Sequence, residues 1–108
     1  MKAIVPYTPG TTVTWLLEAG RMAHQFVRQT VADYDKWRLA YDDHEATRQE
    51  YGLKEIGVHR GAEDPNDITI VFEAESIERA NEFAQSEDLK KMMMEAGVLG
   101  MPDIWFTD

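Results

Sequence analysis

The 108-residue sequence contains no cysteine, only four prolines and far fewer basic than acidic side chains. The absence of cysteine excludes disulfide bonds, thiolate catalysis and metal sites built on thiolates. Lysine and arginine number 11 against 20 aspartates and glutamates, so the formal net charge is −9. A surface of this charge repels phosphate backbones and anionic lipid, and the sequence therefore predicts neither a nucleic-acid nor a membrane partner. No apolar run approaches the ~20 residues of a membrane-spanning helix.

The length of the chain fits a single domain. Residues 1–21 differ in composition from the rest of the chain and precede this domain. Residues 1–21 contain Pro6 and Pro9, and the short stretch after them is too polar for a secretory signal. We therefore expect a cytoplasmic protein with an N-terminal extension at 1–21 and a single domain at 22–108. Two interpretations of the extension stay open. It is either an addition upstream of a natural start at Met22 or an arm that packs on a neighbouring subunit.

The first half of the domain predicts a strand, a helix and a second strand. Residues 22–31 are rich in β-branched and aromatic side chains without a breaker, which is typical of a strand. Asp33 has the position of an N-cap, and the helix after it runs to about Tyr51, just before a glycine. Residues 53–60 form the second expected strand, in which Gly57 indicates a bulge or a close ligand approach.

The second half predicts an antiparallel hairpin, an interrupted helix and a last strand. A turn-rich segment joins the second and third strands, and its short length favours a hairpin. The remaining elements are a strand at 68–74, a helix capped by Ser76, a restart capped by Ser86 and ended by Gly97, and a strand at 103–107 opened by Pro102. The helix after Ser76 is expected to bury one side at three- to four-residue spacing, formed by Ile77, Ala80, Phe83 and Ala84.

The expected order βαββαβ defines an α+β, ferredoxin-like fold, in which a four-stranded antiparallel sheet carries two helices on one face. Apolar residues alternate onto both faces of the strands, for example Ile70 and Val71, or Trp105 and Phe106. The face without helices would expose a broad apolar surface, which usually marks an interface. We therefore predict a homodimer that packs through the two uncovered sheet faces, as a dimeric α/β barrel.

One face of the first helix is aromatic and polar where a plain core would be aliphatic. Spacings of four and three residues place Trp37, Tyr41, His44, Arg48 and Tyr51 on that face. Aromatic walls with hydrogen-bonding heads are typical of a pocket for a planar, partly polar small molecule. The alternative is that Trp37 and Tyr41 belong to the core while His44 and Arg48 are solvated or paired with acidic residues.

Several short motifs carry a resemblance to a known family. They are Val31-Ala32-Asp33-Tyr34-Asp35-Lys36-Trp37, Asp43-His44-Glu45, Val58-His59-Arg60, Asp64-Pro65-Asn66 and Ala96-Gly97-Val98. With them, residues 22–108 resemble the dimeric α/β-barrel superfamily, in particular its antibiotic-biosynthesis monooxygenase-like group. Some members of that superfamily oxidise hydroxyaromatic compounds with O₂ and without metal or flavin. Others degrade haem, isomerise lactones or only bind ligands, and the fold does not choose among these activities.

His44 is the best candidate for a general base, because a neutral imidazole accepts a proton near pH 7. Trp37 and Tyr41 would orient an aromatic substrate, and Arg48 would hold the developing phenolate. The alternative is a structural or surface histidine at position 44.

The far wall of the pocket is predicted from Phe83, Leu89 and Met93, which share the inner side of the second helix. His59 is a further candidate for the substrate site, but His59 and Arg60 must point to opposite sides of the sheet. The sequence leaves open which of the two faces the pocket, and leaves His24 equally undecided. No histidine spacing matches a metal site, so we expect no metal and no cofactor.

The leading functional hypothesis is a cofactor-independent monooxygenase-like enzyme that acts on a small hydroxyaromatic compound. The competing hypothesis is a non-catalytic dimeric protein that binds a small ligand or a partner. The first hypothesis rests on two arguments: the aromatic and polar face of the first helix, and the resemblance to the monooxygenase-like group.

Overall fold

The computed structural model describes residues 22–107, and the N-terminal extension expected at 1–21 lies outside them. The elements are, in chain order, β1 (Ala23–Val31), α2 (Tyr34–Asp43), α3 (Glu45–Glu50), β2 (Leu53–Arg60), β3 (Asp67–Ala74), α4 (Ile77–Ala84), α5 (Glu87–Ala96) and β4 (Val98–Thr107).

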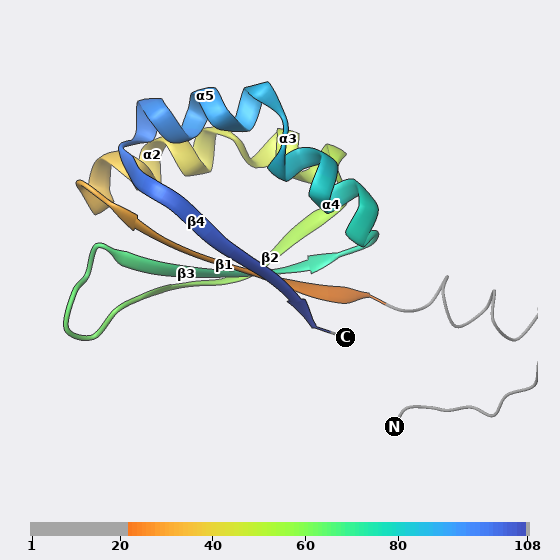
Figure 1. Cartoon of the computed structure of the whole chain (residues 1–108), viewed down its shortest axis with the longest axis horizontal. Helices are drawn as coiled ribbons and strands as arrows, with labels where there is room; N and C mark the ends of the chain where they lie inside the picture. The colour runs from red at the N-terminus through yellow and green to blue at the C-terminus, as the bar shows by residue number, and fades with distance from the viewer. Residues whose placement is uncertain (1–21, 108) are drawn as a thin grey trace, which may run out of the picture.

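The four strands form one antiparallel sheet in the order β2-β3-β1-β4. All helices of the described chain lie on one face of this sheet (Figure 1). The ferredoxin-like α+β prediction is therefore confirmed, with β2 and β4 as the edge strands. No helix between residues 22 and 107 has the length and apolar character needed to cross a bilayer.

The residues predicted to cap the helices occupy the capping positions. Asp33 Oδ1 accepts hydrogen bonds from the backbone N–H groups of Asp35 and Lys36, which opens α2. Ser86 Oγ accepts from the N–H of Leu89 at 3.1 Å, so the expected restart of the second helix is confirmed. Gly97 ends α5 with a φ of 82°, a left-handed conformation that glycine adopts without steric cost.

The prediction of one continuous helix from residue 34 to 51 is wrong, because the helix breaks at His44 between α2 and α3. The backbone N–H of His44 bonds to the Tyr41 carbonyl at 3.1 Å, one residue short of the α-helical partner. The side chain of Arg48 donates to the same carbonyl at 2.7 Å. The carbonyl that the break frees from the helical ladder is therefore satisfied by a side chain of the next helix.

The last strand is longer than predicted. β4 begins at Val98 rather than Asp103, so Pro102, which was expected to open the strand, lies inside it. Proline is tolerated because β4 is an edge strand and its pairing with β1 is irregular between Arg28 and Thr30.

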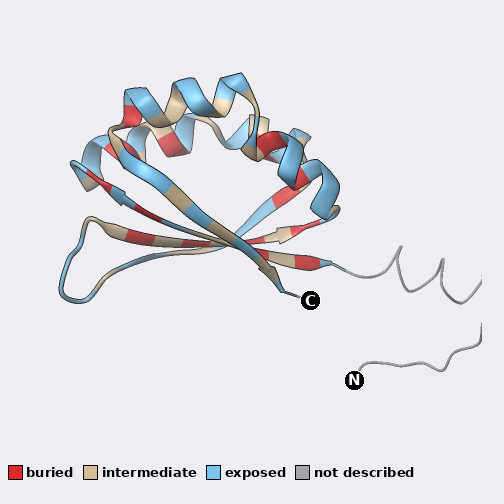
Figure 2. Ribbon diagram, viewed as in Figure 1, coloured by how far each residue is buried: buried red, intermediate tan, exposed pale blue. Residues whose placement is uncertain are grey.

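The core lies between the sheet and the helices. Buried and half-buried residues alternate along β3 (Figure 2). The buried ones include Ile68, Ile70 and Phe72, which belong to one core cluster with residues of the helices. Ala80 and Phe83 of α4 meet them as predicted. Ile77 was expected on the same buried side, but it is 43% exposed at the start of α4.

Candidate functional site

A cavity of about 50 Å³ lies between the sheet and the helices. Most of its wall is apolar. The sheet contributes Val27, Ile70 and Ile104, and the helices contribute Phe83, Met92 and Met93.

Three polar side chains interrupt this apolar wall. Gln25 and Gln29 come from β1 and Arg48 from α3, and their exposed fractions are 3%, 8% and 5%. They are the buried polar residues of the described chain, and all three line the same cavity. Buried polar groups normally have hydrogen-bond partners, so their convergence marks this cavity as the candidate site.

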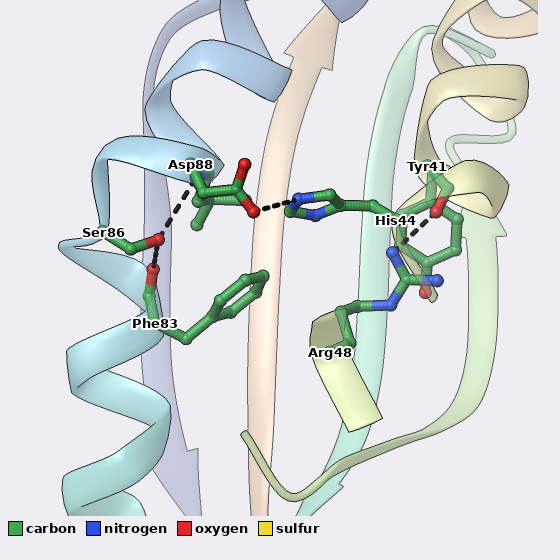
Figure 3. A network of polar contacts seen from close by, with 7 residues as sticks. Tyr41, His44, Arg48, Phe83, Ser86 and Asp88 are labelled. Carbon is green, nitrogen blue, oxygen red and sulfur yellow. Dashed lines mark hydrogen bonds and ion pairs between the residues drawn. The ribbon is translucent and has the colours of Figure 1, made fainter. Parts of the chain in front are cut away.

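Arg48 lines the cavity and forms no ion pair within 4 Å among residues 22–107, although the carboxylates of Asp42, Glu45 and Glu55 share an outer groove with it. Its Nη1 donates to the Tyr41 carbonyl, and its guanidinium carbon lies 3.7 Å from the centre of the Tyr41 ring (Figure 3). Burial lowers the pKa of Arg48, because the charged form loses its hydration there. One hydrogen bond uses only one of five N–H donors, so the guanidinium can still bind an anion.

Tyr41 lies between the cavity and the core. Its hydroxyl donates to Glu55 Oε1 at 2.8 Å, and its ring stacks on Trp37 with centroids 4.7 Å apart. Burial raises the pKa of Tyr41 far above its usual range, although the nearby Arg48 charge acts in the opposite direction. The hydroxyl of Tyr41 therefore stays protonated at neutral pH and is not a base.

The structure separates the helix face that the sequence predicted as one pocket wall. Tyr41 and Arg48 line the cavity, as do the predicted Phe83 and Met93. Trp37 is fully buried in the core instead, and its Nε1–H has no hydrogen-bond partner among the described residues.

His44 lies behind the cavity wall rather than in it. Its ring stacks against Phe83 with centroids 5.8 Å apart, and its Nε2 is 3.0 Å from Asp88 Oδ2 on α5 (Figure 3). The other ring nitrogen, Nδ1, is buried and has no hydrogen-bond partner within residues 22–107. His44 and Asp88 also line an outer groove of about 260 Å³ between α2 and α5.

The register of the sheet settles which way the strand histidines point. His59 pairs with Thr69 and His24 with Glu73, positions that alternate with the buried residues of β3. Both histidines therefore lie on the sheet face away from the helices and the cavity. Arg60 points to the opposite side, where its guanidinium lies 3.7 Å from the Tyr34 ring.

Sequence reasoning did not select Gln25, Gln29 or Asp88. The two glutamines flank Val27 with strand periodicity, so polar residues on a core face were a detectable signal. Asp88 gave no signal, because an acidic residue in the first turn of a helix is ordinary. Between residues 22 and 107 no group of three or more histidine, aspartate or glutamate residues is arranged to hold a metal ion.

The sheet order and the helix layer define a ferredoxin-like α+β protein with a small, largely apolar cavity under its helices. No protein-family model matches the sequence. No curated protein matches it either.

Solved structures share the fold at low sequence identity. A "Putative antibiotic biosynthesis monooxygenase" from Bordetella bronchiseptica superposes with a TM-score of 0.66 and 16% identity, covering 81% of this chain and 95% of that one. A protein of the same name from Caulobacter crescentus gives 0.63 and 14%, covering 89% and 96%. Another, from Nitrosomonas europaea, gives 0.60 and 14%, covering 81% and 88%. These likenesses show that the chain has the fold of this monooxygenase-like group.

Proposed function

We propose that this protein binds a small hydroxyaromatic compound as its phenolate in the cavity and oxidises it with O₂. The buried Arg48 carries the proposal, since it lines an apolar cavity and forms no ion pair with a carboxylate of the described chain. A cation in a water-poor site stabilises a phenolate over the neutral phenol. The wall of Ile70, Phe83 and Met93 suits the face of an aromatic ring.

The reaction needs no external reductant. A phenolate is electron-rich at the carbon para to its oxygen, and that carbon forms a bond to one atom of O₂. The O–O bond then breaks. One oxygen stays as the new carbonyl, and the other leaves as water with the former C–H and O–H hydrogens. One phenol and one O₂ thus give one quinone and one water, with the substrate supplying all four electrons.

The size of the cavity restricts the substrate. A cavity of about 150 Å³ is known to hold one benzene, and this cavity measures about 50 Å³. A ring therefore enters only if the wall moves. Met92 and Met93 on α5 are suited to this because methionine is unbranched and repacks easily. We propose a single-ring or at most a compact two-ring substrate.

His44 is the proposed proton acceptor. The Asp88 carboxylate accepts a hydrogen bond from Nε2–H, which leaves the lone pair of a neutral imidazole on the buried, unpartnered Nδ1. The Phe83 ring separates His44 from the cavity, so the proton passes when that ring and α5 shift to admit the substrate.

One observation favours the competing function, a protein that binds the ligand without reacting. The titratable residues that line the cavity are Tyr41 and Arg48, and neither has a free basic lone pair at neutral pH. Both functions require the ligand anion at Arg48, and only the enzyme consumes O₂.

Calorimetric titration with 4-methylphenol and O₂-electrode measurements with a panel of single-ring phenols test the proposal. We expect binding that weakens at least tenfold in Arg48→Met, and one O₂ consumed per quinone formed. Arg79→Met is the matched control, because Arg79 is exposed on α4, lies outside the cavity wall and, like Arg48, donates to one backbone carbonyl, that of Glu50. Absence of binding by every phenol, or equal binding by Arg48→Met, overturns the proposed ligand. Binding without O₂ uptake leaves the ligand-binding function.

The uncovered sheet face supports a further proposal, that two copies pair through it. Phe26 and Trp105 stack there with centroids 5.4 Å apart and nearly parallel rings, and Trp105 is 44% exposed. A second copy would bury this aromatic pair together with Val71. The partner we propose is therefore another molecule of this chain.

A further inference from the structure

We infer that Glu55 is a positioning residue, which holds Tyr41 in the orientation that directs the Arg48 guanidinium toward the cavity. This inference rests on the proposed function, because it concerns the anion site at Arg48. It assigns a role to a carboxylate that lies outside the cavity wall.

Arg48 lies at the boundary between two spaces. It lines the cavity under the helices, and it also lines an outer groove of about 400 Å³ formed by α2, α3 and β2. It is the one residue that the two linings share. The groove contains the carboxylates of Asp42, Glu45 and Glu55, which attract the guanidinium. An unrestrained Arg48 side chain would therefore turn to the groove and leave the cavity without its cation.

Two contacts with Tyr41 hold the guanidinium at this boundary. Arg48 Nη1 donates to the Tyr41 carbonyl at 2.7 Å, and the guanidinium carbon lies 3.7 Å from the centre of the Tyr41 ring. The carbonyl belongs to the backbone of α2 and is fixed by the helix, whereas the ring can turn about its side-chain bonds. The position of the guanidinium therefore depends on what fixes the ring.

Glu55 fixes the hydroxyl end of the Tyr41 ring. The Tyr41 hydroxyl donates to Glu55 Oε1 at 2.8 Å, a contact between α2 and β2. The ring also stacks on Trp37, but that contact leaves the hydroxyl unrestrained. The hydrogen bond thus connects the cavity, which Tyr41 lines, with the groove, which Glu55 lines.

A β-bulge in the edge strand β2 lies directly beside Glu55. Glu55 pairs with Phe72 and Gly57 pairs with Val71, so Ile56 is an extra residue on β2. Phe72 belongs to the core cluster under the helices, and Glu55 opposite it lies on the same face of the sheet. Ile56 is 51% exposed, and the regular ladder is interrupted next to Glu55. Bulges of this kind re-aim side chains beside functional sites.

Two substitutions separate the hydrogen bond of Glu55 from its charge. Glu55→Gln removes the charge, but its amide oxygen still accepts the hydrogen bond from the Tyr41 hydroxyl. Glu55→Leu removes both the charge and the acceptor. Calorimetry under nitrogen with phenol and toluene compares an ionisable ring with a neutral ring of similar size. Glu63→Leu, in the exposed turn between β2 and β3, is the control.

We expect Glu55→Leu to bind phenol about tenfold more weakly than Glu55→Gln, because loss of the hydrogen bond releases Tyr41 and with it Arg48. Glu55→Gln is expected to bind phenol about threefold more tightly than the wild type, since one carboxylate no longer competes for the guanidinium. Toluene carries no oxygen for Arg48, so its affinity should not fall in either variant. A purely structural Glu55 would weaken both ligands together. Equal phenol binding by the two variants, or a parallel loss of toluene binding, overturns the inference.

The crystal structure of the unliganded Glu55→Leu variant gives a test that needs no phenol. We expect the Arg48 guanidinium to leave the Tyr41 ring and to approach Asp42 or Glu45 in the groove. A guanidinium that stays over the ring overturns the inference. If the wild type binds no phenol, the proposed function fails, whereas a displaced guanidinium in this variant would still show that Glu55 positions Arg48.

Discussion

Arg48 and Tyr41 are joined twice, by a 2.7 Å hydrogen bond from Nη1 to the Tyr41 carbonyl and by a guanidinium 3.7 Å from the centre of its ring. The hydrogen bond satisfies the Tyr41 carbonyl where the helix breaks at His44. The ring of Tyr41 covers one face of the buried guanidinium. The remaining donors of Arg48 are available to the cavity. The same arrangement thus stabilises the local fold and supports the anion site that we propose at Arg48.

Replacing Arg48 by methionine is expected to change the free energy of unfolding by no more than about 1 kcal/mol. The loss of one hydrogen bond is offset because the desolvation cost of a buried charge is removed as well. Urea denaturation of the unliganded protein measures this. A loss of more than about 3 kcal/mol would mean that the guanidinium is chiefly structural, and the anion site would lose its main support.

Tyr41 is expected to make the protein lose stability in alkaline solution. Its pKa is raised in the folded state, so its contribution is complete below the unfolded value of ~10 and declines as the pH rises above it. Urea titrations between about pH 8 and 11 should show a steeper decline for wild-type protein than for Tyr41→Phe. Parallel curves for the two proteins would contradict the burial of an ionisable hydroxyl at this position.

Trp37 is expected to act in stability rather than in ligand binding. It is fully buried and outside the cavity wall, so Trp37→Ala should cost about 3–5 kcal/mol through the space it leaves. Trp37→Phe should cost much less, because the Nε1–H that it removes has no partner. Chemical denaturation gives both values. A direct ligand contact would instead appear as weaker phenol binding by a Trp37→Phe variant of normal stability.

His44→Gln is expected to lower turnover of a phenol about 100-fold while leaving its dissociation constant within about threefold, as loss of a general base implies. Asp88→Asn should lower turnover less, because Asp88 acts through the orientation of His44. Glu87→Gln, a neighbouring and highly exposed carboxylate, is the control. Unchanged turnover in His44→Gln would remove the proposed base and assign phenolate formation to Arg48 alone.

The uncovered sheet face is expected to hold a second copy of the chain. Light scattering of wild-type protein should give twice the 12.4 kDa mass of one chain, and Trp105→Glu should give a single chain. Leu39→Glu is the control, since Leu39 is 71% exposed on α2, on the helix side of the molecule. A wild-type monomer, or a Trp105→Glu dimer, would contradict pairing through this face.

The sequence predicted helix starts correctly where they depend on hydrogen bonds between residues close together in the chain. Asp33 and Ser86 begin helices because their side chains satisfy the first N–H groups, and these contacts span only two or three residues. The break at His44 was missed because a side chain one turn further along, Arg48, supplies the compensating bond. The early start of β4 was missed because an edge strand tolerates Pro102, and edge position is a property of the whole sheet.

The amino-acid sequence by itself determined the βαββαβ order, the helix caps and the aromatic, polar character of the first helix, since periodicity and capping act over a few residues. Only the tertiary structure decided which polar side chains meet. Packing of the helices on the sheet brought Gln25, Gln29 and Arg48 to one cavity, placed His44 beside Asp88, and turned His59 to the opposite face. These relationships join residues far apart in the chain, and they follow from strand register and helix packing.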